Sequence, residues 1–180
     1  MVFPHRKLQR LGGYDYSQNG IYFITICTQN RMCLFGAATK EGIELYTAGK
    51  MVSGIFENVS NIYADIKVEH FVVMPNHIHG LLSIQHDSLA KNDEIDKDGT
   101  TRRSFPTSVS EFVQRFKTLT TKYYIDGVRN GLYPPFNKKI WEKSFYDHII
   151  RDKTDFLNHW QYIDQNPLKW LEDKYFKSTV

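Results

Sequence analysis

Hydrophobic positions follow two different patterns along the chain. Residues 21–28 (IYFITICT) come after the turn signal Asn19-Gly20 and are almost continuously apolar, with many β-branched and aromatic side chains. This composition predicts a central β-strand. Over residues 47–62 the apolar positions recur every three or four residues, which predicts a helix with one apolar stripe. Such a helix would cover one face of a sheet.

The stretch 66–84 (IKVEHFVVMPNHIHGLLSI) predicts a second and a third strand. We expect them to be joined through Met74-Pro75-Asn76, because proline cannot donate to a strand ladder and asparagine tolerates turns. Residues 85–106 are polar, charged and without periodicity. We therefore predict a mobile loop there.

A capping box marks the start of the next helix. Ser108 is followed three residues later by Glu111 and then by apolar positions at helical spacing as far as Tyr123, which predicts a second covering helix. Glycine and proline over 131–135 interrupt the chain. Two more elements are predicted beyond this break.

Residues 145–150 alternate as a strand does, and residues 153–165 have helical spacing before Pro167. The resulting order of strand, helix, strand, strand, helix, strand predicts an α+β, ferredoxin-like split βαβ fold. This fold has a four-stranded antiparallel sheet with helices on one face. A further C-terminal helix would carry Tyr162, and we expect residues 1–180 to form a single domain.

Composition and charge narrow the function only slightly. The 180 residues carry a net charge of +3, which permits an acidic partner such as nucleic acid without requiring one. Cys27 and Cys33 are the two cysteines. No apolar h-region follows the basic residues of the N-terminus, and no uninterrupted apolar stretch approaches the length of a membrane span. We expect a cytoplasmic protein that has no membrane partner.

His77 and His79 flank Ile78 within the predicted third strand, so strand geometry sends both imidazoles to the same face. Two such histidines suit one divalent ion, and with oxygen ligands they would suit Mg or Mn acting on a phosphate. The chain has seven histidines, so this spacing also arises by chance. On its own, this spacing is more often that of ordinary structural histidines.

Tyr162 and Asn166 lie four residues apart on the last predicted helix and therefore share one face. A tyrosine with an ordinary pKa near 10 is a poor nucleophile at neutral pH and needs a cation to polarise its target. Asn166 offers a carbonyl oxygen as a third metal ligand. Without further context, packing remains the commoner role of a helical tyrosine.

Several segments in order resemble one family. EHFVVMPNHIHGLL and SFYDHIIRDKTDFLNHWQYIDQNPLKW, with GYDYSQNGIYFITICTQNRMCLFG and FKTLTTKYY, are similar to the REP-associated tyrosine transposases of the HUH superfamily. The resemblance implies that His77 and His79 bind the metal, that Tyr162 is the nucleophile and that Asn166 is the third ligand. Related insertion-sequence enzymes often carry glutamine at that last position.

The implied reaction is transesterification on single-stranded DNA through a 5'-phosphotyrosine link, with a DNA hairpin at a repeat as the implied substrate. Two other functions stay open: a non-catalytic nucleic-acid-binding module of this fold, and a metal-dependent phosphodiesterase in which water is the nucleophile. The resemblance leaves monomer and homodimer both open. His148 and His159 are interpreted as structural, and Asp164 and Gln165 receive no role.

Basic residues are candidate contacts to the DNA backbone, because neutralising phosphates supplies much of nucleic-acid affinity. We select two clusters, Arg102-Arg103 and Lys138-Lys139, as hypotheses. A solvated face is the ordinary alternative for both.

Overall fold

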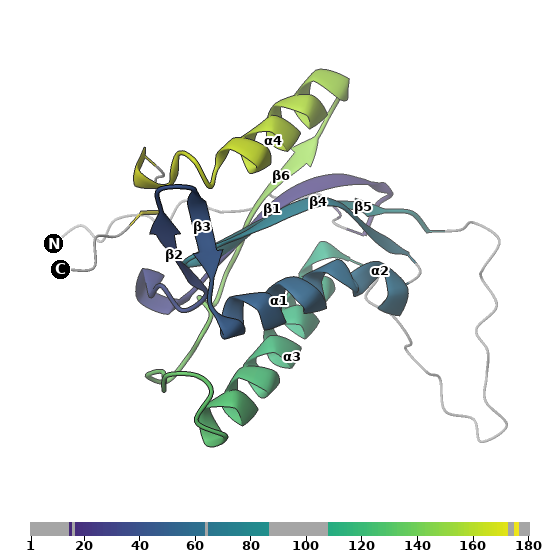
Figure 1. Cartoon of the computed structure of the whole chain (residues 1–180). Coiled ribbons are helices and arrows are strands. Elements are labelled where there is room, and N and C mark those ends of the chain that lie inside the picture. Colours follow the sequence, from purple (N-terminus) through teal and green to yellow (C-terminus); the bar gives the residue numbers. More distant parts are fainter. Residues whose placement is uncertain (1–14, 16, 64, 87–107, 173–174, 177–180) are drawn as a thin grey trace, which may run out of the picture.

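A four-stranded antiparallel sheet forms the centre of the protein (Figure 1). The computed structural model describes residues 15, 17–63, 65–86, 108–172 and 175–176. All but the first two residues of the predicted loop 85–106 therefore lie outside the described residues. In their pairing order, the strands are β4 (Ile66–Met74), β5 (His77–Ile84), β1 (Gly20–Cys27) and β6 (Tyr146–Ile150).

Helices lie on both faces of this sheet (Figure 1). On one face are α1 (Thr47–Glu57), α2 (Val59–Ile62) and α3 (Val109–Arg129). The opposite face carries α4 (Lys153–Gln165), which contacts β4 and β5. The predicted ferredoxin-like fold with an added C-terminal helix is confirmed.

The alternation of side chains along β1 and β5 separates a packing face from a polar face. Ile24 and Ile26 point with Ile78 into the main core, where all three are fully buried. Thr25 pairs directly with His79 in the antiparallel register, on the face that α4 covers. The functional candidates of β5 are thus turned away from the main hydrophobic core.

Gly80 allows a close approach between the sheet and α1. A Cβ atom at this position would lie 2.7 Å from the ring of Phe56, closer than packed carbon atoms come. Phe56 in turn contacts Phe112 and Phe116 of α3 edge to face. This aromatic cluster anchors both covering helices to the sheet.

Two local features differ from the sequence prediction. The helix expected over 47–62 is two helices, because the chain breaks at Asn58, whose side-chain nitrogen donates to the carbonyl of Gly54. A small hairpin of β2 (Gly36–Thr39) and β3 (Gly42–Leu45) was not predicted. Two short 3-10 helices, Gln29–Arg31 and Trp170–Glu172, complete the elements.

The capping residues fix where α3 and α4 begin. Ser108 accepts a hydrogen bond from the Glu111 amide, as the predicted capping box requires, and Asp152 accepts one from the Asp155 amide at 2.9 Å. Pro167 follows the end of α4, again as predicted. None of the helices in the described part of the chain is long and apolar enough to cross a membrane.

Candidate active site

His77 and His79 point to the α4 face of the sheet, as the strand period predicts, and neither is exposed to solvent. Their Nε2 atoms lie 2.9 Å apart. Each Nδ1 atom has its own partner: Asn76 Oδ1 at 2.9 Å for His77 and Thr25 Oγ1 at 2.8 Å for His79. Partners on the far nitrogen orient both rings with Nε2 facing inward, as metal-binding histidines require.

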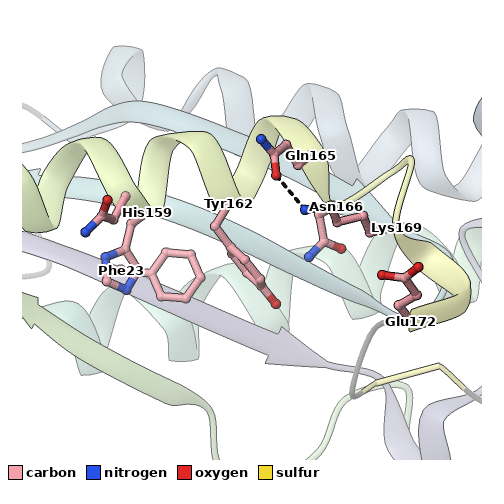
Figure 2. Close-up of a pocket in the computed structure, with 8 residues that line it drawn as sticks. Phe23, His159, Tyr162, Gln165, Asn166, Lys169 and Glu172 are labelled. Atoms are coloured by element: carbon pink, nitrogen blue, oxygen red, sulfur yellow. Dashed lines mark hydrogen bonds between the residues drawn. The ribbon is translucent and has the colours of Figure 1, made fainter.

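Tyr162 reaches this pair from α4. Its ring centroid lies 5.1 Å from that of His79 and 5.9 Å from that of Phe23. The side chain is 38% exposed and lines an open pocket of about 520 Å³. Figure 2 shows Tyr162 projecting from the helix towards the strands beneath it. The tyrosine is therefore accessible from solvent while it contacts the buried His79.

Asn166 follows Tyr162 by one helical turn and donates its backbone amide to the Tyr162 carbonyl at 3.1 Å. It lines the same pocket, and its side chain extends from α4 on the same side as that of Tyr162 (Figure 2). Only 4% of the residue is exposed, and Oδ1 has no hydrogen-bond partner among the described residues. A buried carbonyl oxygen in this state is costly unless a ligand uses it.

Two aromatic residues near the C-terminus pack against the histidine pair, and no pattern in the sequence predicts them. Tyr175 packs its ring centroid 4.8 Å from that of His77, and Trp170 lies 5.9 Å from the same ring. The Tyr175 carbonyl accepts a hydrogen bond from Asn76 Nδ2. Burial raises the pKa of the Tyr175 hydroxyl well above its ordinary value. Periodicity could not reveal these contacts, because they connect segments almost a hundred residues apart.

Tyr175 also contacts Arg31, whose guanidinium carbon lies 4.3 Å from the ring centroid. Arg31 also donates to the Cys27 sulfur at 2.7 Å and pairs with Glu142 at 3.4 Å. Burial nevertheless raises the pKa of the Cys27 thiol to about 12. Cys27 is therefore a neutral packing residue and not a nucleophile at neutral pH.

The histidines predicted to be structural have carboxylate partners. His148 and His159 both contact Asp155. Burial raises the pKa of Asp155, but hydrogen bonds from His148 and the Arg151 amide, together with electrostatic interactions with His148 and His159, bring the pKa below its ordinary value. Asp164 pairs with His70 at 2.7 Å, and Gln165 accepts from Lys169 at 2.8 Å.

Of the two basic clusters, Arg102-Arg103 lies outside the described residues. Lys138 and Lys139 are exposed in the loop before β6. They directly precede Ile140, whose carbonyl accepts from the Gln29 amide just beyond the end of β1. Cys27, the last residue of β1, pairs with His77, so this cluster lies at the same end of the sheet as His77.

Comparison with solved structures gives the same class of fold. The structure of a REP-associated tyrosine transposase bound to a REP hairpin superposes with a TM-score of 0.54, over 89% of this chain and 74% of that one, at 19% sequence identity. The fold is thus that of a tyrosine transposase.

Two relatives from Haemophilus influenzae extend the similarity to the sequence. An uncharacterised protein is 31% identical over 180 residues, covering 96% of this chain and 93% of its own length. Another, named "putative REP-associated tyrosine transposase", is 27% identical over 165 residues, covering 86% of this chain and 74% of its own length. No family model matches the chain. The chain is thus similar along most of its length to a protein named as a REP-associated tyrosine transposase, and this similarity supports a transposase-like function.

Proposed function

We propose that this protein is a metal-dependent single-stranded DNA transposase whose nucleophile is Tyr162. The observation that carries the proposal is the contact between Tyr162 and His79: an accessible tyrosine stacks edge-on at 5.1 Å against a buried, oriented histidine pair. A tyrosine retained only for packing has no need of this arrangement. Activation of a hydroxyl nucleophile does require charge stabilisation close by.

His77, His79 and Asn166 would hold the divalent cation, Mg²⁺ or Mn²⁺. The donor set fits, because two Nε2 atoms face each other and the buried Oδ1 of Asn166 has no other partner among the described residues. When bound, the cation supplies positive charge that polarises the scissile phosphate. Thr25 and Asn76 keep the two rings oriented for this task.

The proposed reaction exchanges one phosphodiester for another. The Tyr162 oxygen bonds to the DNA phosphorus while the bond from phosphorus to the 3'-oxygen breaks, and the phenolic proton ends on the released 3'-hydroxyl. The strand's 5' end is then a phosphotyrosine ester. Because no bond energy is lost to water, attack by a 3'-hydroxyl reverses the step and joins strands.

Hairpin DNA with a single-stranded flank is the proposed substrate. A REP hairpin is bound by the tyrosine transposase that shares this fold. The open pocket beside Tyr162 is lined by Phe23 and His159, whose flat rings suit an unpaired base. Lys138 and Lys139 add positive charge at the same end of the sheet as His77.

The test incubates the purified chain with Mn²⁺ and end-labelled hairpin DNA that carries single-stranded flanks. Wild type, Tyr162→Phe and His77→Ala are compared on a denaturing gel. Tyr123→Phe is the matched control, because Tyr123 is also an exposed helical tyrosine, at 49%, but lies on α3. We expect a labelled protein band for wild type and Tyr123→Phe, and loss of the band to below detection in the other two variants.

Each remaining outcome supports another function. Cleavage that persists in Tyr162→Phe and yields free 5'-phosphate would identify a metal-dependent hydrolase and refute the transferase mechanism. Binding of the hairpin without cleavage by any variant would identify a nucleic-acid-binding module that has lost the chemistry.

A further inference from the structure

Three potential metal ligands converge where the edge strand β6 meets the first turns of α4. His148 Nε2 lies 3.1 Å from Asp155 Oδ1 and 2.9 Å from Oδ2, and His159 Nδ1 lies 3.0 Å from the same Oδ1. The two imidazole rings stack at 4.6 Å with 20° between their planes. One carboxylate is therefore approached by two histidines from different elements.

We propose that His148, Asp155 and His159 form a second divalent-cation site, separate from the site of His77, His79 and Asn166. Two imidazole nitrogens and a carboxylate oxygen form a ligand set typical of Zn²⁺. The three ligand atoms all lie within 4.8 Å of one another, and ligands of one tetrahedral zinc ion are about 3.3 Å apart. Side-chain rotations would have to bring them to that spacing when a cation binds.

The surroundings of these side chains hold two of the three ligands in place. Asp155 Oδ2 accepts a hydrogen bond from the Arg151 amide at 3.1 Å, and the His159 ring packs 4.7 Å from Phe23. The His148 side chain is 43% exposed. A cation can therefore enter from solvent, and a fourth position stays open to water, as in three-ligand zinc sites.

In the other histidine–carboxylate pairs among the described residues, the carboxylate is contacted by one histidine and not by two. His86 contacts Asp65 at 3.1 Å, and His70 contacts Asp164 at 2.7 Å. Each of these carboxylates has one histidine partner in the structure, which suits an ordinary hydrogen bond. The second imidazole at Asp155 is the feature that favours a cation.

A cation held here would connect β6 to α4 one helical turn before Tyr162. It would stabilise the docked position of the helix that carries the proposed nucleophile. The inference does not depend on strand transfer, because it rests on the ligand set alone and is tested by binding.

Zinc binding is measured by equilibrium dialysis of the full chain with Zn²⁺ alone. The background is the double variant His77→Ala/His79→Ala, which removes the other proposed site. We expect one ion per chain in this background, and an affinity at least about tenfold lower when His148→Gln or Asp155→Asn is added. His86→Gln is the matched control and should leave the affinity unchanged, because it breaks a pair of the same kind.

A second measurement on the wild-type chain covers the case in which the background variant does not fold. Long-range ¹H–¹⁵N NMR spectra follow the imidazole nitrogens during Zn²⁺ addition. Shifts of the His148 and His159 signals, with those of His86 unmoved, support the site. Absence of shifts at His148 and His159, or dialysis affinity that His148→Gln does not change, overturns the proposal whatever the result of the DNA assay.

Discussion

The environment of Asn166 favours the proposed role of a metal ligand over that of a packing residue. Its side-chain oxygen is buried and lacks a partner among the described residues, a state that costs about 1–3 kcal/mol. Binding a cation would recover this energy. The related insertion-sequence enzymes with glutamine at the corresponding position offer the same kind of carbonyl oxygen.

We expect Asn166→Ala to raise the Mn²⁺ concentration needed for half-maximal strand transfer by about tenfold, the effect of losing about 1.4 kcal/mol of binding energy. The measurement is the yield of covalent protein–DNA product across a Mn²⁺ titration. Asn158→Ala is the control, because Asn158 lies on the same helix and lines the same pocket but is exposed. Equal Mn²⁺ requirements in the two variants would remove Asn166 from the ligand set.

The spacing of residues in strands and helices predicted which way the key side chains point, but not which residues surround them. The two-residue strand period correctly sends His77 and His79 to one face, and helical spacing places Tyr162 and Asn166 on one side of α4. Tyr175 was missed because its contact with His77 depends on tertiary packing across many intervening residues. Local sequence carries no signal for such a contact.

Among the elements, α4 crosses the sheet and is held near both of its ends. Asp155, in its first turn, contacts His148 of β6, and Asp164, in its last turn, pairs with His70 of β4 at 2.7 Å. Between these anchors, Tyr162 stands over His79. The position of the tyrosine therefore depends on strands at opposite edges of the sheet.

The pairing of β4 with β5 is irregular at Glu69, and protonation of this carboxylate at low pH should weaken the edge of the sheet. The register shifts between Val68 and His70. Burial raises the pKa of the intervening Glu69, but hydrogen bonds from Lys67 and Ser83 outweigh it and bring the pKa below its ordinary value of 4.5. A lowered folded-state pKa contributes stability above pH 4.5, and this contribution is lost as the pH falls through the folded value.

Glu69→Gln should therefore lower the free energy of unfolding by about 0.5–1 kcal/mol at pH 7. The difference from wild type should shrink below pH 4.5 as Glu69 becomes protonated. Urea denaturation followed by circular dichroism at several pH values provides the measurement. Glu57→Gln, at an exposed carboxylate that ends α1, serves as the control. A difference that stays constant from pH 7 to acid would contradict this role of Glu69.

Long, strongly patterned elements were predicted almost to the residue, whereas short ones were not. The strands on either side of Pro75 and the helix over 153–165 match the structure. The hairpin of β2 and β3 was missed because each strand has four residues, too few for a period to appear. The break at Asn58 depends on one side-chain hydrogen bond, which an apolar stripe cannot reveal.

Across the whole molecule, the main hydrophobic core and the proposed active site lie on opposite faces of the sheet. One face carries α1 and α3 over the main core, and the other carries α4 and the proposed site (Figure 1). The order of the elements was sufficient to predict this fold, because few topologies satisfy the rules for short connections. The charge distribution was harder to predict, since a net charge of +3 does not indicate which face is basic.

The loop before β6 gives a test of where DNA lies on the whole molecule. Lys138 and Lys139 are exposed at the end of the sheet where β1 and β5 bring Cys27 and His77 together. A single strand that enters the pocket beside Tyr162 and continues past this end would meet both lysines. Each phosphate neutralised on a single strand contributes about 0.7 to the slope of log affinity against log salt.

We expect Lys138→Glu/Lys139→Glu to weaken hairpin binding and to reduce the magnitude of that slope by about 1.4, because two phosphate contacts are lost. Fluorescence anisotropy across a salt series measures both quantities. Lys50→Glu is the control, because Lys50 is exposed on α1, on the face opposite α4. An unchanged slope in the double variant would mean that the strand leaves Tyr162 in another direction. In that case, Lys138 and Lys139 belong to an ordinary solvated surface.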